Sequence, residues 1–408
     1  MISKPINQPG TVSCVFINCT GETFTPTKSG ALCTWIWEMC QAAKKEGIEP
    51  LVITRTSDAE PYHWPRTVFL KYPWIPNFRG SGIGRLIKIQ QRMTGWGHAR
   101  QKNYAVKMVR AIREAGAESL PMVLQNDPEL AVFLRQNFPD AFILHLFQNS
   151  NPCSDKFRAE FARSVNVAVA VSEYCARWNA DYFGGDVGVF YNSVDTNRFS
   201  PALRFPPGPP VINFVGRTDR QKAPDLLLRA AKLLSEKTKD FQLQILGSRF
   251  YGWSEPDPYQ LELEALAQDL DRSGITVNRP GFIGRHALPD ELRKAHIHVV
   301  PSRWDDPCPL VTLEGMACGL ATVASRTGGT PELVGDAGFL FERDSVEELA
   351  GHLYELVMDA DLRASMGQKA RERAECFTWD IAWQKLKRLI GLPQGEMTAS
   401  AVGAGNHL

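Results

Sequence analysis

No stretch of the sequence approaches the roughly 18 uninterrupted apolar residues of a membrane-spanning helix. The first residues, MISKPINQPG, also lack the basic-then-apolar order of a secretory signal. The nine cysteines contain no CxxC pair, and such an odd, scattered set is typical of reduced thiols rather than of a disulfide framework. These absences predict a cytoplasmic protein.

An excess of one charge is missing as well, since 46 Lys and Arg stand against 45 Asp and Glu. The net charge of +1 excludes a general polyanion binder, so we expect no nucleic-acid partner. Hydrophobic residues make up 44% of the 408 residues, which is enough for two or three domains with their own cores. No pattern specifies an oligomeric state.

Acidic residues are absent between Glu60 and Glu114, and this interval holds eleven basic ones. Within it, Arg85, Lys88 and Arg92 alternate with apolar residues at near-helical spacing. A basic amphipathic helix is typical of contact with an anionic membrane surface, which would place the protein peripherally at the inner face of the membrane. The alternative is a helix that packs on its own domain and leaves its basic face in solvent.

Short apolar runs alternate with helical stretches along the whole chain. In the first half we expect strands near 12–18, 50–54, 122–125, 142–147 and 165–171, with helices over 31–46 and 100–116. In the second half we expect strands near 211–215, 242–246, 275–277, 298–301 and 321–324, with helices over 224–236, 257–271, 288–295 and 309–318. Strand alternating with helix predicts parallel, doubly wound sheets.

The segment 201–210, PALRFPPGPP, is half proline and can form neither a helix nor a central strand. It therefore predicts a linker between an N-terminal domain over 1–200 and a C-terminal domain over 211–378. A last helix over 379–393 is expected to return to the N-terminal domain. The small-residue tail over 394–408 is expected to be disordered.

Three groups of residues follow expected strands, where ligands of such sheets bind. The first is Gly216, Arg217 and Lys222, on a loop that enters a helix. An Arg and a Lys at this spacing can face one diphosphate, to which the helix N-terminus adds partial positive charge. Such a pair would neutralise charge on a leaving diphosphate. Two exposed surface cations are the alternative.

The second group is Asp306 and Glu314, eight residues apart on a loop and on the helix after it. Carboxylates suit sugar hydroxyls because one carboxylate can accept several hydrogen bonds. Glu314 lies between Leu313 and Met316 in an apolar helix, so it needs a partner. The third group is TGGTPE at 327–332, where a glycine pair allows close backbone approach and leaves amides for phosphate.

In this order, the patterns GR…K, PS…DPxxLxxxEGMACG and GGxPE resemble the retaining, nucleotide-sugar-dependent glycosyltransferases of family four. The match runs over about 211–379, with weaker matches at YNSVD (191–195), VS (171–172) and Ser29-Gly30. The resemblance implies the GT-B fold, an α/β architecture of two doubly wound Rossmann-like domains facing across a cleft.

The resemblance also implies roles for single residues. Arg217 and Lys222 would bind the diphosphate of the donor, Glu314 its ribose hydroxyls, and Asp306 the transferred sugar. Further donor contacts would come from Gly30, Gly216, Gly281, Phe282, Ile283, Pro307, Cys308, Pro309 and Leu310. The family needs neither a metal nor a cofactor besides the donor, since the basic pair neutralises the charge.

Two positions depart from the family pattern. Asp306 replaces the usual glutamate and is one methylene shorter. His145 lies two residues before the strand end where many relatives have a histidine. It either substitutes as a catalytic residue or is a core histidine, and its apolar strand favours the core. His296 and His298 share a strand face without a nearby third ligand, which indicates a structural role rather than a metal site.

We therefore expect a retaining hexosyltransferase that uses a nucleoside diphosphate sugar, with a UDP-sugar the first expectation and GDP-mannose the second. The acceptor would be a hydroxyl of a glycan or lipid-linked saccharide, as in the synthesis of cell-surface polysaccharide. One alternative is a catalytically silent nucleotide-sugar binder, and another is a different GT-B enzyme such as an epimerase. A nicotinamide dehydrogenase is not expected, because no GxGxxG follows the first strand of either half.

Overall fold

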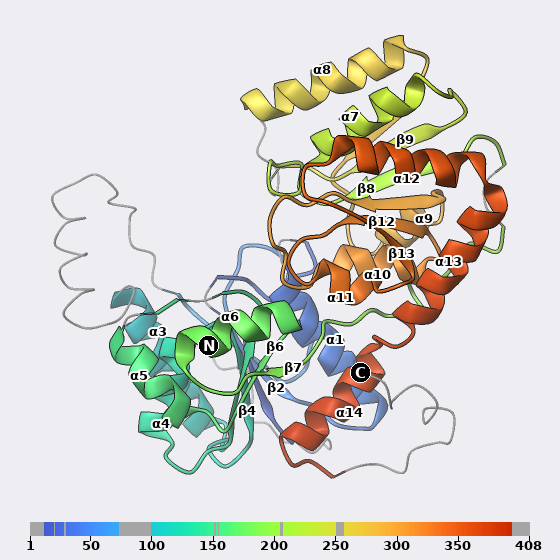
Figure 1. Cartoon of the computed structure of the whole chain (residues 1–408). Coiled ribbons are helices and arrows are strands. Elements are labelled where there is room, and N and C mark those ends of the chain that lie inside the picture. Colours follow the sequence, from blue (N-terminus) through green and yellow to red (C-terminus); the bar gives the residue numbers. More distant parts are fainter. Residues whose placement is uncertain are drawn as a thin grey trace, which may run out of the picture. The chain divides into compact units, whose positions relative to one another are not determined.

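The computed structural model describes residues 12–19, 21–27, 30–72, 99–150, 152–153, 155–204, 207–249 and 257–393. The chain divides into two compact units (Figure 1). The first contains Met1–Tyr191 and Trp379–Ser400, and the second contains Asn192–Thr378. The division thus falls before the proline-rich segment 201–210, which lies inside the second unit. The tail over 394–408 is outside the described residues.

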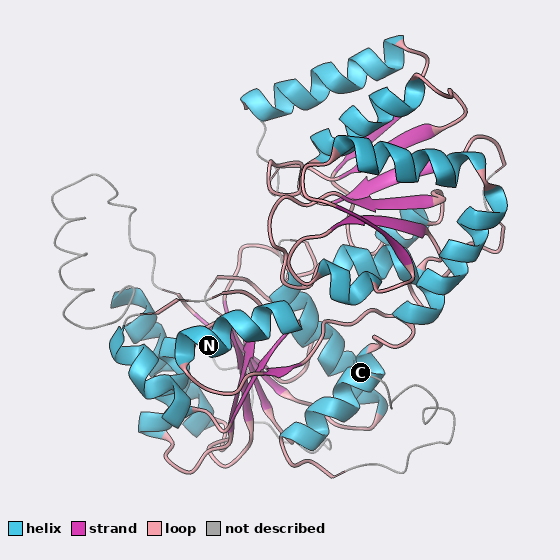
Figure 2. Ribbon diagram, viewed as in Figure 1, coloured by secondary structure: helices cyan, strands magenta, loops and turns pink. Residues whose placement is uncertain are grey.

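The first unit is built on a parallel sheet with the strand order β3-β2-β1-β4-β5-β6-β7. Its strands are β1 (Val15–Ile17), β2 (Leu51–Arg55), β3 (Thr67–Leu70), β4 (Met122–Gln125), β5 (Ile143–Phe147), β6 (Val167–Ala170) and β7 (Gly188–Val189). Its helices are α1 (Ala31–Lys45), α3 (Ala99–Glu114), α4 (Pro128–Asn137), α5 (Asp155–Ser164), α6 (Glu173–Phe183) and α14 (Trp379–Leu389). Helices cover both faces of this sheet (Figure 2).

Helix α14 is the last described element and packs on α1 within the first unit. Two ion pairs join the helix to the C-terminal end of α1. The Lys387 Nζ lies 2.6 Å from Glu46 Oε2, and the Lys45 Nζ lies 2.7 Å from Asp380 Oδ1. Lys387 is fully buried, so its ammonium depends on Glu46 for compensation of its charge.

The second unit has a parallel sheet in the order β10-β9-β8-β11-β12-β13. Its strands are β8 (Val211–Val215), β9 (Gln242–Leu246), β10 (Val277–Gly281), β11 (Ile297–Val300), β12 (Ala321–Ser325) and β13 (Gly338–Phe341). Its helices are α7 (Pro224–Ser235), α8 (Pro258–Arg272), α9 (Leu288–Leu292), α10 (Leu310–Ala317), α11 (Thr330–Val334), α12 (Val346–Met358) and α13 (Ala360–Ala374). The two doubly wound sheets confirm the predicted α/β class.

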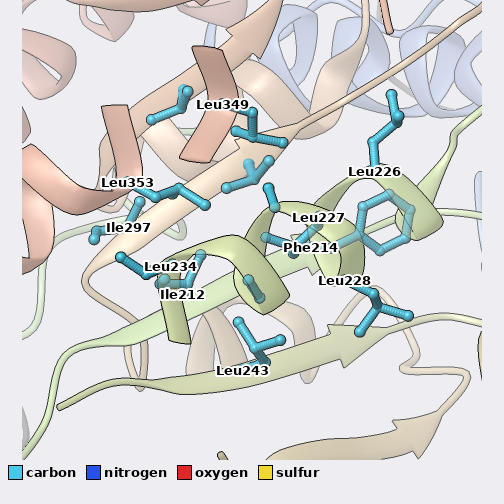
Figure 3. Packing of buried hydrophobic residues seen from close by; sticks show 14 of the residues in the cluster. Ile212, Phe214, Leu226, Leu227, Leu228, Leu234, Leu243, Ile297, Leu349 and Leu353 are labelled. Atoms are coloured by element: carbon cyan, nitrogen blue, oxygen red, sulfur yellow. The ribbon is translucent and has the colours of Figure 1, made fainter. Parts of the chain in front are cut away.

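A buried apolar cluster holds α7 against the second sheet. Ile212 and Phe214 alternate along β8 and therefore share one face, where they belong to one cluster with Leu227 and Leu234 of α7 (Figure 3). Full burial of each such side chain contributes about 1.5–3 kcal/mol. This packing fixes the start of α7, and with it the loop that carries Arg217 and Lys222.

Edge strands account for the main errors of the sequence prediction. A strand was expected over 275–277, but β10 runs from Val277 to Gly281 and includes Pro280. Proline cannot donate to a neighbouring strand, and it is tolerated here because β10 lies at the edge of its sheet. The edge strand β3 of the first unit was not predicted at all.

Candidate active site

The strand order of the second unit places its topological switch point at the carboxyl ends of β8 and β11. These strands are neighbours, and the chain continues from them toward opposite halves of the sheet. Ligands of doubly wound sheets bind at such a switch point. Gly216 and Arg217 follow β8 directly, and the segment 301–306 follows β11. The structure therefore brings the first two predicted groups to one place.

Two glycines let the backbone turn tightly at this edge. Gly216 has a φ of +154° and Gly247, after β9, has a φ of +142°. A Cβ atom on Gly247 would lie only 1.8 Å from the carbonyl oxygen of Gly216. The two loops thus lie backbone against backbone, which only glycine allows at these dihedral angles.

Asp219 contacts both basic residues of the predicted diphosphate site, one through its side chain and the other through its backbone. The Arg217 Nε lies 3.2 Å from Asp219 Oδ2, and the backbone N–H of Lys222 donates to Asp219 Oδ1 at 3.0 Å. The Lys222 ammonium forms an ion pair with Asp306 and lies 5.3 Å from the ring centre of Trp304. Sequence reasoning missed Asp219, although an Asp that starts a turn two residues after Arg217 was a usable signal.

Asp306 is buried, with 6% of its surface exposed. Its backbone N–H donates to the Trp304 carbonyl at 2.8 Å, and its own carbonyl accepts from the Gly329 N–H at 2.9 Å. A Cβ atom on Gly328 would lie 2.2 Å from that carbonyl oxygen. The glycine pair therefore makes the predicted close approach, but toward the Asp306 loop.

The amides of the glycine pair are consequently not left for phosphate, which corrects the prediction. The Gly328 N–H donates to Asp305 Oδ1 at 3.1 Å, and the Gly329 N–H is used by Asp306. Arg343 forms an ion pair with the same Asp305 carboxylate. The glycine pair thus positions the loop that carries Asp306.

Glu314 lies on α10 with only 2% of its surface exposed. The sequence predicted that it needs a partner, and that partner is Arg285, whose Nη2 lies 2.8 Å from Glu314 Oε1. Helix α10 can lie close to β11 because residue 315 is a glycine. A Cβ atom there would lie 2.3 Å from the ring of His298.

His298 has the structural role that the sequence indicated. Its Nδ1 lies 2.7 Å from Asn213 Oδ1 within the sheet, and burial lowers its pKa to about 4. The Nδ1 of His296 accepts from the Val211 N–H at 3.1 Å. Among the described residues, no three His, Cys, Asp or Glu side chains gather as a metal site requires.

The segment 307–310 leads into the N-terminus of α10, with Pro309 as the cap residue. Cys308 is buried, and its carbonyl accepts from Asn192 Nδ2 at 3.1 Å. Asn192 belongs to the YNSVD match, so this turn holds the predicted donor segment in place. The Thr312 N–H donates to the Pro309 carbonyl at 3.1 Å, and the N–H groups of the two residues before it point out of the helix by geometry. They are suited to an anionic group.

A second ion pair ties the loop after β11 to α7. Arg303 donates to both carboxylate oxygens of Asp225, at 2.7 and 2.8 Å. Burial alone would raise the pKa of Asp225, but hydrogen bonds from Arg303 and Tyr259 outweigh it and lower the pKa. The backbone N–H of Arg303 donates to the Gln221 carbonyl at 2.8 Å. The loops that carry Lys222 and Asp306 are therefore joined.

Gly281, Phe282 and Ile283 lie at the end of β10. Gly281 has a φ of +83°, its carbonyl accepts from the Gly247 N–H at 2.8 Å, and Phe282 is 54% exposed. Gly247 and Gly281 help to line a cavity of about 370 Å³ with side chains from α7 and α8. This volume lies in the range of small-ligand pockets.

Gly30 and His145 belong to the first unit. Gly30 was expected among the donor contacts; in the structure its N–H donates to Glu22 Oε2 at 3.1 Å, and the Cys33 N–H donates to the same oxygen at 3.0 Å. Burial raises the pKa of Glu22. The carboxylate of Glu22 thus occupies the N-terminus of α1.

His145 lies in the middle of β5 without solvent exposure. Its Nε2 accepts from the Asp127 N–H at 3.1 Å, and its ring lies 4.2 Å from Phe147 and 5.1 Å from Phe161 between ring centres. Burial lowers its pKa to about 3, so the ring is neutral. This geometry favours the core interpretation of His145 over the catalytic one.

The basic residues Arg85, Lys88 and Arg92 lie outside the described residues. In the part of the chain that the structure describes, no helix combines the length and the apolar character needed to cross a membrane.

Comparisons with known proteins point to one family. Residues 195–373 match the family described as glycosyl transferases group 1. A D-inositol 3-phosphate glycosyltransferase of Corynebacterium jeikeium is 36% identical over 217 residues, which cover 50% of this chain and 49% of the relative. Spore coat protein SA of Bacillus subtilis is 24% identical over 285 residues, covering 64% of this chain and 74% of that protein. The chain thus spans about half the length of the first of these curated relatives.

Solved structures resemble nearly the whole chain at low identity. Sucrose-phosphate synthase of Thermosynechococcus elongatus has a TM-score of 0.70 and 18% identity, covering 92% of this chain and 98% of that one. Anabaena HepE in complex with UDP has a TM-score of 0.66 and 18% identity, covering 93% and 100% of the two chains. These neighbours confirm the predicted fold.

Proposed function

We propose that the chain is a retaining, metal-independent hexosyltransferase, because residues 195–373 match the glycosyl transferases group 1 family and the chain has the GT-B fold. Its donor is a nucleoside diphosphate sugar, with a UDP-sugar as the first candidate and GDP-mannose as the second. Its acceptor is a hydroxyl of a glycan or lipid-linked saccharide, as in the assembly of cell-surface polysaccharide. A structural neighbour solved with UDP supports the first candidate.

The observation that carries this proposal is that two cations and the buried Asp306 meet at one edge of the second sheet, with the buried Glu314 on the helix that follows. Arg217 and Lys222 are joined by Asp219, while Asp306 and Glu314 lie on the neighbouring loop and helix. A diphosphate that approaches this edge meets both cations and the N-terminus of α10. Such a set stabilises a leaving diphosphate by electrostatics that are in place before the reaction.

Donor binding exchanges ion pairs at this site. In the structure, Lys222 is paired with Asp306 and Arg217 with Asp219. The phosphates of the donor compete for both cations, and Asp306 can then accept hydrogen bonds from the hydroxyls of the transferred sugar. In the retaining mechanism that we propose, the departing phosphate takes the proton of the acceptor hydroxyl, so the chain supplies position and charge rather than a strong base.

Glu314 is the residue that we assign to the ribose. Its carboxylate can accept bonds at both oxygens, so Arg285 and a ribose diol can share it. Arg285 therefore compensates the charge of the buried carboxylate while the sugar binds. The cavity beside Gly281 is the candidate site of the base.

A thermal-shift panel of UDP, GDP, ADP and their sugars tests the donor site. A ligand that binds only the folded state at about 100 times its Kd stabilises it by about 2.7 kcal/mol, which corresponds to a rise of several degrees. We expect one nucleotide to stabilise the parent but neither Arg217→Ala nor Glu314→Gln. The control is Arg272→Ala, an exposed arginine of the same unit. If no nucleotide stabilises the parent at millimolar concentration, the donor assignment is wrong.

The stereochemistry of transfer has its own test. With the donor identified, proton NMR of the first product formed reports the configuration at the anomeric carbon. A retaining enzyme gives the configuration of the donor, and an inverted product would contradict the proposed mechanism. Nucleotide binding without turnover on any acceptor would favour the silent binder.

The basic segment suggests where the acceptor is presented. Arg85, Lys88 and Arg92 suit an anionic membrane surface, and each such cation contributes about 1 kcal/mol of attraction. We expect the parent to co-sediment with vesicles that contain anionic lipid, and the triple reversal to Glu to release it. Absence of binding by the parent would end the membrane hypothesis without affecting the donor site.

A further inference from the structure

We infer that the first unit binds an uncharged, hydroxyl-bearing ring through three buried side-chain amides, those of Asn18, Gln125 and Gln148. This inference rests on the proposed function, since the ring would be the acceptor. The three amides are exposed by 0%, 1% and 4%, respectively. They are the polar counterpart, in the first unit, of the charged site in the second.

Topology places the three amides together. Asn18 follows β1, Gln125 ends β4 and Gln148 follows β5, and these three strands are neighbours in the order β1-β4-β5. The chain continues from β1 and from β4 toward opposite halves of the sheet, so this edge is the switch point of the first unit. The residues that follow the amides, Cys19, Asn126 and Asn149, are each half-buried. The amides therefore lie just inside the surface.

Hydrogen bonds fix how Asn18 is oriented. Its Nδ2 donates to the carbonyl of Glu22 at 3.3 Å and to Thr54 Oγ1 at 3.2 Å. The opposite orientation would place two acceptor oxygens against each other. The Oδ1 of Asn18 is buried and has no partner among the described residues. Asn18 thus offers an acceptor to a ligand.

The side-chain amides of the two glutamines are hydrogen-bonded to each other, and each amide keeps one polar group without a partner. Gln148 Nε2 donates to Gln125 Oε1 at 2.7 Å. Gln125 Nε2 and Gln148 Oε1 are then buried without a partner in the described part of the chain. If both amides were turned over, the pair would still leave one NH₂ group and one oxygen. The pair therefore offers a ligand one donor group and one acceptor oxygen in either orientation.

The three polar groups without partners determine which kind of ligand fits them. They are two acceptor oxygens and one donor group, and buried polar atoms without partners are destabilising. A hydroxyl can donate to the oxygens and accept from the NH₂ group. A phosphate only accepts, and its oxygens would repel those of Asn18 and Gln148. Vicinal hydroxyls of a sugar or cyclitol ring satisfy all three groups.

The test replaces the glutamine pair by apolar side chains of similar length, in Gln125→Met/Gln148→Met. Because the change removes buried polar atoms that lack partners, we expect the melting midpoint to hold or rise. Donor-induced stabilisation should be unchanged. The KM for the acceptor should rise about tenfold for each hydrogen bond lost. The probes are myo-inositol, D-glucose and D-fructose and their monophosphates, offered with the donor identified above.

A matched control is Gln244→Met, a buried glutamine on β9 of the second unit that also has an oxygen without a partner in the described residues. It should leave the acceptor KM unchanged. We compare the affinity of the double Met variant for the free ring and for its monophosphate. Equal losses of affinity for the two support the inference. If the variant melts several degrees lower with an unchanged acceptor KM, the amides are structural and only water satisfies them.

Two further outcomes also overturn the inference. One is an acceptor phosphate whose binding depends on Arg55, at the end of β2, and not on the amides. The other is that none of the rings binds or acts as an acceptor although a nucleotide still stabilises the parent. That result would reject this inference but not the donor site. Failure of the nucleotides as well would instead reject the proposed function.

Discussion

Each unit gathers polar side chains where two neighbouring strands lead to opposite halves of its sheet. In the first unit this place lies between β1 and β4, and its buried side chains Asn18 and Gln125 are neutral amides. In the second it lies between β8 and β11, and the side chains are ions, of which Lys222 and Asp306 form one pair. The same topology therefore holds two different kinds of site.

The difference shows what each site can do without a ligand. Ions of opposite sign satisfy one another, so the second unit is balanced until a diphosphate competes for its cations. The amides of the first unit leave Asn18 Oδ1 and Gln148 Oε1 without partners in the described residues, so this edge is complete only with a ligand or with water. Charge should govern affinity in the second unit, and hydrogen-bond geometry in the first.

The largest effect is expected when the ion pair of the second unit is opened. Lys222→Met removes a cation from the diphosphate, and loss of one such group in an active site typically lowers kcat/KM about 10²–10³-fold. It also leaves the buried Asp306 without its partner, so we expect a lower melting midpoint. Steady-state kinetics with the identified donor measure the first effect, and thermal unfolding the second.

The double variant Lys222→Met/Asp306→Asn separates the two effects. It should regain much of the lost stability, because the uncompensated carboxylate is gone, but not the activity. Recovery of activity in the double variant would show that Lys222 acts through Asp306 alone and not on the diphosphate.

A second large effect is expected on stability alone. Asp225→Asn removes the charge that holds two hydrogen bonds of Arg303, which keeps only its ion pair with Asp344, and loss of such a partly buried pair should cost about 1–3 kcal/mol. Urea unfolding measures the loss. Asp290→Asn is the control, since its pair with Arg293 is exposed and worth little. Equal losses in the two variants would contradict the tie between α7 and the loop after β11.

Most of the fold could be predicted because its central strands are short apolar runs that alternate with helices. The prediction of β4 over 122–125 and β8 over 211–215 was correct to the residue. Two edge strands were predicted less well because their signal is weaker. The strand expected over 275–277 is displaced in β10, which contains Pro280, and β3 has only partly buried or exposed side chains.

Single functional residues of the site could be predicted from their residue type and local pattern, but their partners could not. A glutamate in an apolar helix indicated that Glu314 needs a partner, but nothing in the sequence identified Arg285, 29 positions away, as that partner. The same holds for Asp225 and Arg303, 78 positions apart. Long-range pairs depend on how strands are ordered in the sheet, and spacing along the chain does not report that order.

Acid should destabilise the second unit more than the first, and this effect should be smaller than those of the substitutions above. Burial lowers the pKa of His298 in the second unit to about 4, so between about pH 4 and 6.5 only its unfolded state takes up that proton. Stability is therefore complete above pH 6.5 and falls as the pH drops toward 4, by up to about 1.4 kcal/mol per pH unit. In the first unit, burial lowers the pKa of His145 to about 3 but raises that of Asp127 to about 7.

These two shifts offset each other in the first unit. Between pH 4 and 6.5 its folded state keeps a proton on Asp127, and its unfolded state keeps one on His145 instead, so little net uptake remains. Hydrogen exchange at pH 5 and 7 reports the stability of each unit separately. We expect the strands of the second unit to lose protection first, and His298→Gln to reduce that loss. Earlier loss in the first unit would show that the two shifts do not cancel.

The smallest effect is expected at Gly30, which was predicted from the sequence to contact the donor. A Cβ atom there would lie 2.3 Å from Glu22 Oε1, which is the end of a flexible side chain and can move away. Gly30→Ala should therefore weaken only the contact of Glu22 with the N-terminus of α1, at a cost of about 0.3–1 kcal/mol. Titration calorimetry should find the Kd of the nucleotide unchanged, since in this structure the Gly30 amide is bound to Glu22. A clear loss of nucleotide affinity would mean that the donor displaces Glu22 from α1, and the first unit would then use charge at its sheet edge as the second does.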